Sequence, residues 1–421
     1  MNEDTNNNQA GFWISFELSN VSIMDVKRNE DGDYNIKVRS TLVGTKCGKC
    51  GQDIRKFHSN EREISLRDLP IFGCQVFIKM CPIRYKCKRC NSTTTQQLEW
   101  YYQRSPNTKR FEEHILLQLI NCTIQDVAKK EKVTYDIVEG IIDRHIKKEV
   151  DWNEFETLEV LGIDEIANLK GHRQYFAIIT ARIGQDIKIL TVLPDRKKRS
   201  VKKFLNKIPH RLKITVHTVC TDMNEGYINA FKEVFKQPDY KINIVIDRFH
   251  VAKNYRECVE DLRKIELKRI KQEISEEEFK KLKNVHWALR KKASDLTDAQ
   301  KEQLEFLFTL SEALCEAYKF MNDLTNIFEL RISRNSAKKK INQWKEDVKA
   351  SSLTCFDKFL RTLTKHLELI INYFVHRHSS GFVEGLNNKL KVIKRCGYGF
   401  RNVNNFFRRI FLSLEGYRLY A

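Results

Sequence analysis

The sequence predicts an α/β core with a mixed sheet, interrupted by a long all-helical segment and preceded by a zinc ribbon and a helix-turn-helix. Two C-x2-C pairs, "CGKC" at 47–50 and "CKRC" at 87–90, lie about forty residues apart. Residues 157–250 alternate strand-like apolar runs with helical ones, whereas residues 251–375 are charged, amphipathic and free of strand pattern. These three observations set the order of the domains along the chain.

The chain has 421 residues, too many for one compact domain. Lysine and arginine number 75 against 55 acidic residues, a formal net charge of +20. Such an excess favours a polyanionic partner, nucleic acid before membrane, although a merely basic protein is the plain alternative. We expect five segments, with boundaries at 1–104, 105–150, 151–250, 251–375 and 376–421.

No apolar run reaches the length needed to span a bilayer. The start, "MNEDTNNNQAGFW", has neither the basic head nor the apolar middle of a signal peptide. We therefore expect a protein that stays inside the cell, in the cytoplasm and not in a membrane. In that compartment the twelve cysteines should be reduced thiols or metal ligands.

Residues 1–104 carry short alternating runs that predict strands, such as "FWISFEL", "YNIKVRS" and "QVFIKM". Cys47, Cys50, Cys87 and Cys90 have the spacing with which four thiolates close a tetrahedron around one zinc ion. The alternative is that these cysteines are inert reduced thiols. Other residues between the pairs are expected to pack or to form hairpins: His58, Cys74 and Cys81.

Residues 109–149 change to a helical period, with Thr123 and Thr134 at positions typical of N-caps. A short link between the second and third helices predicts a helix-turn-helix. The third helix would enter a major groove with Tyr135 near its tip, and Arg144 is a further candidate for DNA contact. An ordinary three-helix connector is the alternative. Packing is expected from Val127, Ala128, Ile137, Ile141 and Ile142.

From residue 157 the period becomes that of strands again. "TLEVLGIDE" predicts a strand that ends in Asp164, and two hairpin strands, "RQYFAIITARI" and "DIKILTVL", follow it. Two strand–helix units then place Asp222 and Asp247 at the ends of "KITVHTVCTD" and "KINIVIDRFH". Hairpin strands followed by strand–helix units predict a mixed sheet, in which functional groups gather at the C-terminal ends of strands.

The run "HSSGFVEGLNNKLKVIKR" predicts an amphipathic helix opened by Ser379 or Ser380. One stripe is apolar and would dock on the sheet: Val383, Leu386, Leu390 and Ile393. A second stripe offers a carboxylate followed by amide and cationic groups: Glu384, Asn388, Lys391 and Arg395. Glu384 could serve only to complement the helix dipole.

Asp164, Asp222 and Glu384 are explained better by one shared function than by three separate structural roles. Asp164 alone could cap a strand end, and Asp222 could be the N-cap of the following helix. Converging carboxylates repel one another, by roughly 4 kcal/mol at ~4 Å and an effective dielectric near 20, so a cluster of them needs a cation. Oxygen ligands with open positions suit Mg²⁺ or Mn²⁺, and two such ions support phosphoryl transfer.

The chain resembles a DDE transposase of bacterial insertion sequences, closest to the ISL-three family. The resemblance is nearly full length and rests on "CGKC…CKRC", the helix-turn-helix, "LGIDE", "CTDMNEGY", "DRFHVAKN" and above all "GFVEGLNNKLKVIKRCGYGFRN". It implies an RNase H-like core, interrupted by a helical insertion before the catalytic glutamate. By motif the catalytic triad is Asp164, Asp222 and Glu384. Asp247 and His250 of "DRFH" are second-tier candidates, with a helix cap and a packed histidine as the alternative.

This resemblance implies a transposase that binds double-stranded DNA, both the element's terminal inverted repeats and the target, and works as a homodimer or larger assembly. Its cofactors would be Mg²⁺ or Mn²⁺ at the triad and a structural zinc. Five basic residues would line the DNA path: Lys389, Lys391, Lys394, Arg395 and Arg401. Two rivals stay open, a DNA-binding regulator with an inactive core and an RNase H-like nuclease without strand transfer.

Overall fold

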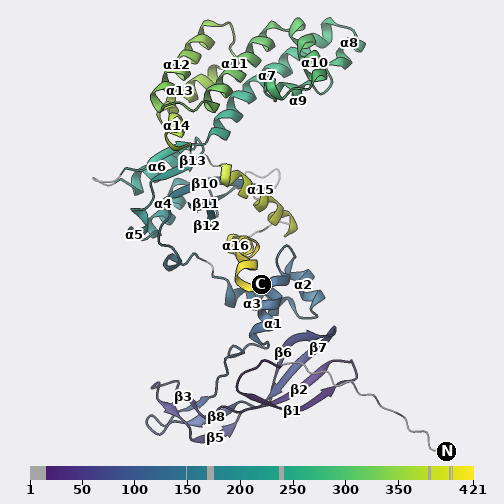
Figure 1. The fold of residues 1–421 in the computed structure, drawn as a ribbon, viewed down its shortest axis with the longest axis vertical. Helices are drawn as coiled ribbons and strands as arrows, with labels where there is room; N and C mark the ends of the chain where they lie inside the picture. The colour runs from purple at the N-terminus through teal and green to yellow at the C-terminus, as the bar shows by residue number, and fades with distance from the viewer. Residues whose placement is uncertain are drawn as a thin grey trace, which may run out of the picture. The chain divides into compact units, whose positions relative to one another are not determined.

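The computed structural model describes residues 16–147, 149–167, 175–236, 241–377, 381–397, 400 and 402–421, with the side chains of 381–384 outside the description. The chain divides into two compact units. The first comprises residues 1–146 with 412–421, and the second comprises residues 147–411. Each unit is considered by itself (Figure 1).

The first unit begins with three small sheets. Their orders are β1-β2-β7-β6, β3-β4 and β5-β8-β9. The strands are β1 Val21–Arg28, β2 Tyr34–Ser40, β3 Thr45–Lys46, β4 Asp53–Ile54, β5 Phe57–Asn60, β6 Ile64–Ile71, β7 Cys74–Met80, β8 Ile83–Lys86 and β9 Thr93–Thr95. The predicted strands "YNIKVRS" and "QVFIKM" are confirmed as β2 and β7. The strand predicted at 12–18 is wrong in its described part, because 16–18 is not strand and β1 starts at Val21.

Three helices follow, α1 Lys109–Gln118, α2 Ile124–Lys130 and α3 Tyr135–His145. Both predicted N-caps are confirmed, since the hydroxyl of Thr123 accepts from the Asp126 amide and that of Thr134 from the Ile137 amide. The predicted packing needs one correction. Val138 and Ile141 are the fully buried residues of α3, whereas Ile137 and Ile142 are only half-buried. The buried face is therefore rotated by about one residue from the predicted one.

The second unit is built on a five-stranded sheet of order β12-β11-β10-β13-β14. Its strands are β10 Val160–Ala167, β11 Tyr175–Ile183, β12 Asp186–Leu193, β13 Thr218–Thr221 and β14 Asn243–Ile246. The first three are antiparallel neighbours, and β10, β13 and β14 run parallel. The predicted mixed sheet is confirmed. Parallel strands end at the same edge, so the residues that follow β13 and β14 emerge together.

Each face of this sheet is covered by a different set of helices. α4 Lys198–Lys207, α5 His210–Lys213 and α6 Glu225–Val234 pack on one face, where Leu161 and Ile163 of β10 join Phe204 and Phe231 in a core. Val160 points to the opposite face and belongs to the core of the long helical segment. Alternation along β10 therefore sends Asp164 to the same face as Val160, and Glu165 to the α6 side.

The long helical segment is confirmed, since its described residues 251–375 contain helices and turns but no strand. α7 begins at the N-cap Asp247 and runs from the sheet into a stack of helices (Figure 1). The elements are α7 Arg248–Glu273, α8 Glu276–Lys281, α9 Val285–Leu289, α10 Asp298–Leu310, α11 Glu312–Glu329, α12 Arg334–Ala350, α13 Asp357–Ile371 and α14 Tyr373–His376. Short 3₁₀ turns occupy Trp152–Glu154 and Ala293–Asp295.

Two helices close the chain, α15 Gly381–Cys396 and α16 Val403–Tyr420. α15 packs against β10 through Leu386, Leu390 and Ile393, which are all buried, so the described part of the predicted apolar stripe is confirmed. Val383 lies outside the described side chains, and Ser379 and Ser380 lie outside the described residues. Among the described helices, none combines the length and apolar character that crossing a bilayer requires.

Candidate active site and cysteine centre

Strand register brings three aspartates to one edge of the sheet. β10 pairs with β13 up to Gly162 opposite Cys220, and two residues further Asp164 stands beside Asp222. β13 pairs with β14 up to Thr221 opposite Ile246, and the Asp247 amide extends this ladder by donating to the Thr221 carbonyl at 2.9 Å. Neighbouring strands lie ~4.8 Å apart, and residues in register share a face. The three carboxylates therefore follow one another across three strands.

Asp164 is not at a strand end, which corrects the sequence-based expectation. β10 continues to Ala167, because its antiparallel partner β11 pairs with it as far as Tyr175. The parallel partner β13 ends earlier, at Thr221. Asp164 thus sits inside β10 at the level where the neighbouring parallel strands have already ended, which leaves its side chain facing the open edge.

Asp222 is not the N-cap of the helix that follows it. Asn224 takes that role, with its side-chain oxygen accepting from the Gly226 amide at 2.8 Å. Asp222 Oδ1 accepts from the Asn224 amide at 2.9 Å, which fixes the carboxylate in a tight turn. Its second oxygen has no hydrogen bond to any described residue.

Asp247 and His250 both reach this edge. Asp247 is 2% exposed and caps α7, accepting from the Phe249 amide at 3.2 Å. His250, in the first turn of α7, places Nε2 3.8 Å from Asp164 Oδ1. The cap predicted as the plain alternative for Asp247 therefore exists, and the same residue also lies in line with the other two aspartates.

Asn387 is the residue that sequence reasoning missed. It lies on α15, is 4% exposed, and its side-chain amide donates to Asp164 Oδ2. Its own Oδ1 is buried and accepts no hydrogen bond from any described residue. A buried amide oxygen without a donor is costly, and in a group of carboxylates it is placed to bind a cation. The only signal in the sequence is its position one helical turn after Glu384.

Burial dominates the electrostatics of the aspartates. It raises the pKa of Asp164 above its ordinary value, against the hydrogen bond from the Glu165 amide and the nearby His250. Burial also raises the pKa of Asp222, against the hydrogen bond from the Asn224 amide and, again, His250. Nearby acids raise the pKa of each aspartate further, Asp247 and Glu165 for Asp164, and Glu165 and Asp164 for Asp222. A cation at this edge would relieve both effects.

Glu165 belongs to the opposite face of β10. It accepts from the Tyr227 hydroxyl at 2.9 Å and from Asn224 Nδ2 at 3.3 Å, and it forms an ion pair with Arg196 at 3.3 Å. These contacts tie β10 to α6. The Asn224 side chain binds Glu165, and its backbone amide binds Asp222. Glu165 therefore helps to position Asp222 from the opposite face of the sheet.

Glu384 lies within α15, but its side chain is outside the described part of the chain, and Arg401 is outside the described residues. The other members of its predicted stripe are exposed: Asn388, Lys391 and Arg395. Lys389 is exposed as well, whereas Lys394 is partly buried and donates to the Ala167 carbonyl of β10. Lys394 thus holds α15 to the sheet.

Arg144 has a clear structural contact within the first unit. Its guanidinium binds both carboxylate oxygens of the fully buried Glu112, at 2.9–3.2 Å. His145 and Ser105 also bind Glu112. Burial opposes ionisation of Glu112, but the hydrogen bonds from His145 and Arg144 outweigh it and leave its pKa below the ordinary value. Tyr135 is 43% exposed at the start of α3, as a groove-contacting residue needs to be.

The four predicted cysteines form one cluster in the first unit. Their sulfurs lie within 4.8 Å of one another, with Cys47–Cys90 at 3.4 Å, Cys50–Cys87 at 3.7 Å and Cys50–Cys90 at 3.9 Å. A tetrahedron with Zn–S bonds of ~2.3 Å has sulfurs ~3.8 Å apart. The cluster is therefore compatible with a zinc ribbon. In the described part of the chain, no other three His, Cys, Asp or Glu side chains have ligand atoms this close together.

Two matching turns build the cluster. Each C-x2-C pair sits on a turn after a short strand, and the next residue has a positive φ, +71° at Gly51 and +55° at Asn91. The Cys47 and Cys87 amides donate to Gln52 and Ser92 carbonyls at 2.8 Å, closing both turns. Hydrogen bonding by Ser92, assisted by backbone amides, lowers the pKa of Cys47 to about 5. This favours the thiolate of Cys47, the form that binds metal. Against the hydrogen bond from the Gln52 amide, burial and the neighbouring cysteine sulfurs raise the pKa of Cys50 instead, to about 11.

Comparison with known protein families gives two matches. Residues 161–410 match a family described as "Transposase", the ISL3 group of DDE transposases. Residues 96–146 match the "Helix-turn-helix domain of transposase family ISL3". The first match covers the sheet from the second residue of β10 onward, the helical segment and α15, and the second covers α1–α3 with the residues just before them.

Individual relatives agree with these matches. The chain is 25% identical to the transposase for insertion sequence element IS1001 of Bordetella parapertussis, over 91% of this chain and 92% of that protein. It is 22% identical to the transposase for IS1557 of Mycobacterium tuberculosis, over 94% and 93%. A third similarity, 44% identity to an ATP-dependent protease of Lactococcus lactis, covers only 57 residues and 18% of that protein.

Proposed function

The chain belongs to transposase family ISL3, a family of DDE transposases, and on that premise we propose that Asp164, Asp222 and Glu384 are its catalytic acids. As a transposase it cuts and rejoins DNA strands of an insertion sequence, and its helix-turn-helix binds DNA.

The observation that carries the triad is the register of the sheet. It sets Asp164 beside Asp222 on one face, and α15 packs on β10 at that same face. Asn387 meets Asp164 from α15, so the residue one turn earlier, Glu384, belongs to a segment that approaches the acidic edge. Asp247 and His250 lie at the same edge, and we propose that they help to position the catalytic acids or the DNA strand.

The metal is proposed to be Mg²⁺ or Mn²⁺, held by the three acids with Asn387 Oδ1 as a neutral oxygen donor. Three observations fit a hard cation. The possible ligands are all oxygen atoms, two of the carboxyl groups have raised pKa values, and the buried Asn387 Oδ1 accepts no hydrogen bond from any described residue. When bound, such ions activate the attacking hydroxyl and stabilise the leaving oxygen in phosphoryl transfer. The protein's own part is to fix the carboxylates and orient the DNA strand.

Around this chemistry we propose the following organisation. The mixed sheet is an RNase H-like core, a proposal supported by its antiparallel hairpins followed by parallel strand–helix units. The cysteine cluster binds one structural zinc. Segments 1–104 and 105–150 hold the terminal inverted repeats, 151–250 and 376–411 form the core, and 251–375 is its insertion. Residues 412–421, predicted from the sequence to lie in the core, belong to the first unit. Transposition joins two ends, so the DNA-bound enzyme is proposed to be a homodimer or larger.

The basic residues of α15 are proposed to guide DNA past the acids. Lys389, Lys391 and Arg395 are exposed on the helix that carries Glu384, and Arg401 follows it in sequence. Phosphate contacts of this type position a duplex without reading its sequence. Lys394 anchors α15 to β10 instead. Tyr135 is proposed to contact the groove, and Arg144 to act through the ordering of α3 against α1.

The decisive experiment is cleavage and strand transfer on a DNA fragment that carries the element's own ends, with and without Mg²⁺. Wild type should act only with metal, and Asp164→Asn and Asp222→Asn should be inactive. Asp186→Asn, an exposed acid on β12 of the same sheet, is the matched control and should keep activity. Activity of Asp164→Asn close to that of wild type would exclude the proposed site.

A further inference from the structure

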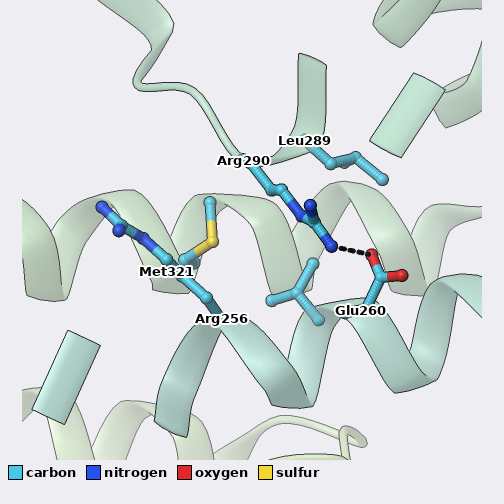
Figure 2. Close-up of a pocket in the computed structure, with 6 residues that line it drawn as sticks. Arg256, Glu260, Leu289, Arg290 and Met321 are labelled. Atoms are coloured by element: carbon cyan, nitrogen blue, oxygen red, sulfur yellow. Dashed lines mark ion pairs between the residues drawn. The ribbon is translucent and has the colours of Figure 1, made fainter. Parts of the chain in front are cut away.

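A row of charged side chains runs along one face of α7 inside the helical segment. Arg256, Glu260, Arg263 and Leu267 follow one another at intervals of four, three and four residues, which places them on the same side of the helix. Arg263 binds Glu260 at 2.7 Å, and Arg290, at the end of α9, pairs with the same carboxylate at 3.9 Å. Figure 2 shows Arg290 directed toward Glu260, with Arg256 on the same helix. One carboxylate thus pairs with two guanidinium groups, those of Arg263 and Arg290.

A hollow of about 290 Å³ opens beside this row. Its basic lining comes from Arg263, Lys280, Lys283 and His286, and Phe279 contributes an aromatic ring. No acidic residue lines it. Lys280 and Lys283 form no ion pair with any described residue, so their positive charge is available to an outside anion. The smaller hollow in Figure 2, between Glu260 and Met321, has room only for about one water.

Trp287 stands at the rim of this basic region. α9 buries Val285, Ala288 and Leu289 against the helical core, and that packing turns Trp287 outward, with 57% of its surface exposed. The ring lies 4.8 Å from the imidazole of His286, and the Arg290 guanidinium lies 5.6 Å from its centroid. An exposed tryptophan flanked by two basic side chains is poorly explained as a core residue, because little of it is buried.

We propose that this surface binds the transposase's DNA where a nucleotide is unpaired, with Trp287 stacking on the base and Lys280, Lys283 and Arg290 binding the adjoining phosphates. Aromatic rings beside cations are the usual platform for unpaired nucleic acid, since every base has a π-face. A paired duplex hides those faces, so stacking requires an end, gap or bulge. The hollow beside His286 accepts the neighbouring nucleotide.

This inference rests on DNA as the substrate but not on the proposed acidic triad. DNA binding can be measured with no added divalent metal, where no strand is cut. If the triad is assigned wrongly, the acid variants will still cleave DNA, and binding to an unpaired nucleotide is unaffected. If this surface is assigned wrongly, Trp287→Ala will bind DNA like wild type, and the cleavage results are unaffected. The two proposals can therefore fail separately.

The test compares two probes of equal length, a fully paired duplex and the same duplex with two unpaired thymidines, by fluorescence anisotropy with the full chain. Wild type should bind the second probe more tightly. Trp287→Ala should weaken binding to that probe by about 5- to 150-fold, the range expected for losing one stacked base, and leave the paired probe unchanged. Trp287→Phe, which keeps a ring, should restore most of the preference.

Two matched controls come from α7. Ile265 is 65% exposed and lies two residues from both Arg263 and Leu267, on the other side of the helix, so Ile265→Ala should bind like wild type. Lys268→Ala removes an exposed charge away from the row and should change the salt dependence less than Lys283→Ala, which should lower the slope by roughly 0.7. The proposal is overturned if wild type does not distinguish the probes. It is also overturned if Trp287→Ala keeps the distinction.

Discussion

The cysteine centre and the acidic edge are both proposed to hold a cation, yet they are assembled in opposite ways. The cysteines come from two short turns within 44 residues of sequence, Cys47 to Cys90, and their sulfurs already lie at tetrahedral separations. The acidic edge gathers Asp164, Asp222 and Asp247 from three strands and Asn387 from a helix more than 220 residues after the first aspartate. The ligands of the first centre are close together in sequence and surround one point, whereas those of the second are far apart in sequence and leave one side open.

This contrast bears on what each cation does. At the cysteines, strands of only two to four residues surround the cluster, and a small core supports it: Cys47, Ile54, Tyr85 and Cys87. Such strands hold together poorly by packing alone, so a metal bound there would serve the fold. At the acidic edge the strands are buried between two helical layers, and this packing is expected to hold the fold together without a cation. A metal bound there would serve the reaction.

The largest expected effect is loss of the zinc centre. Cys50→Ser should release about one zinc per chain and unfold the ribbon, because a structural zinc contributes on the order of 10 kcal/mol to a small domain. Metal content by mass spectrometry and proteolysis of residues 45–95 would measure both. Cys81→Ser, an exposed cysteine outside the cluster, is the control. A zinc-free protein with a protease-resistant ribbon would show that the cysteines do not work as a metal site.

Next in size is the loss of catalysis at the acidic edge without loss of fold. Glu384→Gln should lower strand cleavage by roughly 10³-fold or more, since it removes a charge that binds the metal used in the transition state. Zinc content, melting temperature and end binding should stay at wild-type values. Combining it with Asp222→Asn should add little, because residues acting as one unit are not additive. Near-normal strand transfer by Glu384→Gln would remove it from the triad.

The two centres also differ in how far sequence could predict them. The four-cysteine cluster and the caps at Thr123 and Thr134 depend on spacings of two or three residues, so pattern alone was sufficient to predict them. The position of Asp164 in its strand was wrong, because the apolar run ends there but pairing with β11 carries β10 on to Ala167. A strand's end depends on its partners, which no local pattern records.

Asn387 illustrates the same limit at the site itself. Asn387 and Asn388 are adjacent and chemically identical, and counting four residues from Glu384 selects Asn388. Docking of α15 through Leu386, Leu390 and Ile393 buries Asn387 instead and leaves Asn388 exposed. The rotation of a helix on a sheet is set by how its apolar stripe fits the strands beneath it. Sequence therefore indicated the helix and its faces, but not which amide meets Asp164.

A third prediction concerns this amide. Asn387→Ala removes both the donor to Asp164 and the buried oxygen, and should raise the Mn²⁺ concentration for half-maximal cleavage by roughly 10- to 100-fold, as residues that orient metal ligands do. Asn388→Ala changes an exposed neighbour and should leave the metal dependence unchanged. Metal titration of cleavage separates them, because a merely structural loss would lower the maximal rate without moving the midpoint. An unmoved midpoint for Asn387→Ala would exclude it from the metal site.

The smallest effect, and the last, is on stability. Burial raises the pKa of Asp164, so the folded protein binds that proton more tightly than the unfolded chain does. Without metal, the wild type therefore loses stability as the pH rises from the ordinary pKa of 3.8 through the raised one, and the ionised carboxylate is a cost above it. Asp164→Asn removes that charge and keeps an oxygen for Asn387. The variant should melt a few degrees higher than wild type at pH 7 and at the same temperature below pH 4.

Added metal should reverse this order. Mn²⁺ binds the folded wild type and stabilises it in proportion to the metal bound, whereas the variant has lost a ligand and should gain less. Melting curves at pH 7 with and without Mn²⁺ give the comparison, and Asp186→Asn, at an exposed acid, should follow wild type in both. The cysteine centre should behave in the opposite way, with loss of its metal lowering stability and no substitution of a ligand raising it. If Asp164→Asn melted below wild type without metal, the carboxylate would be contributing to the fold, and the separation of a metal for folding from a metal for reaction would not hold.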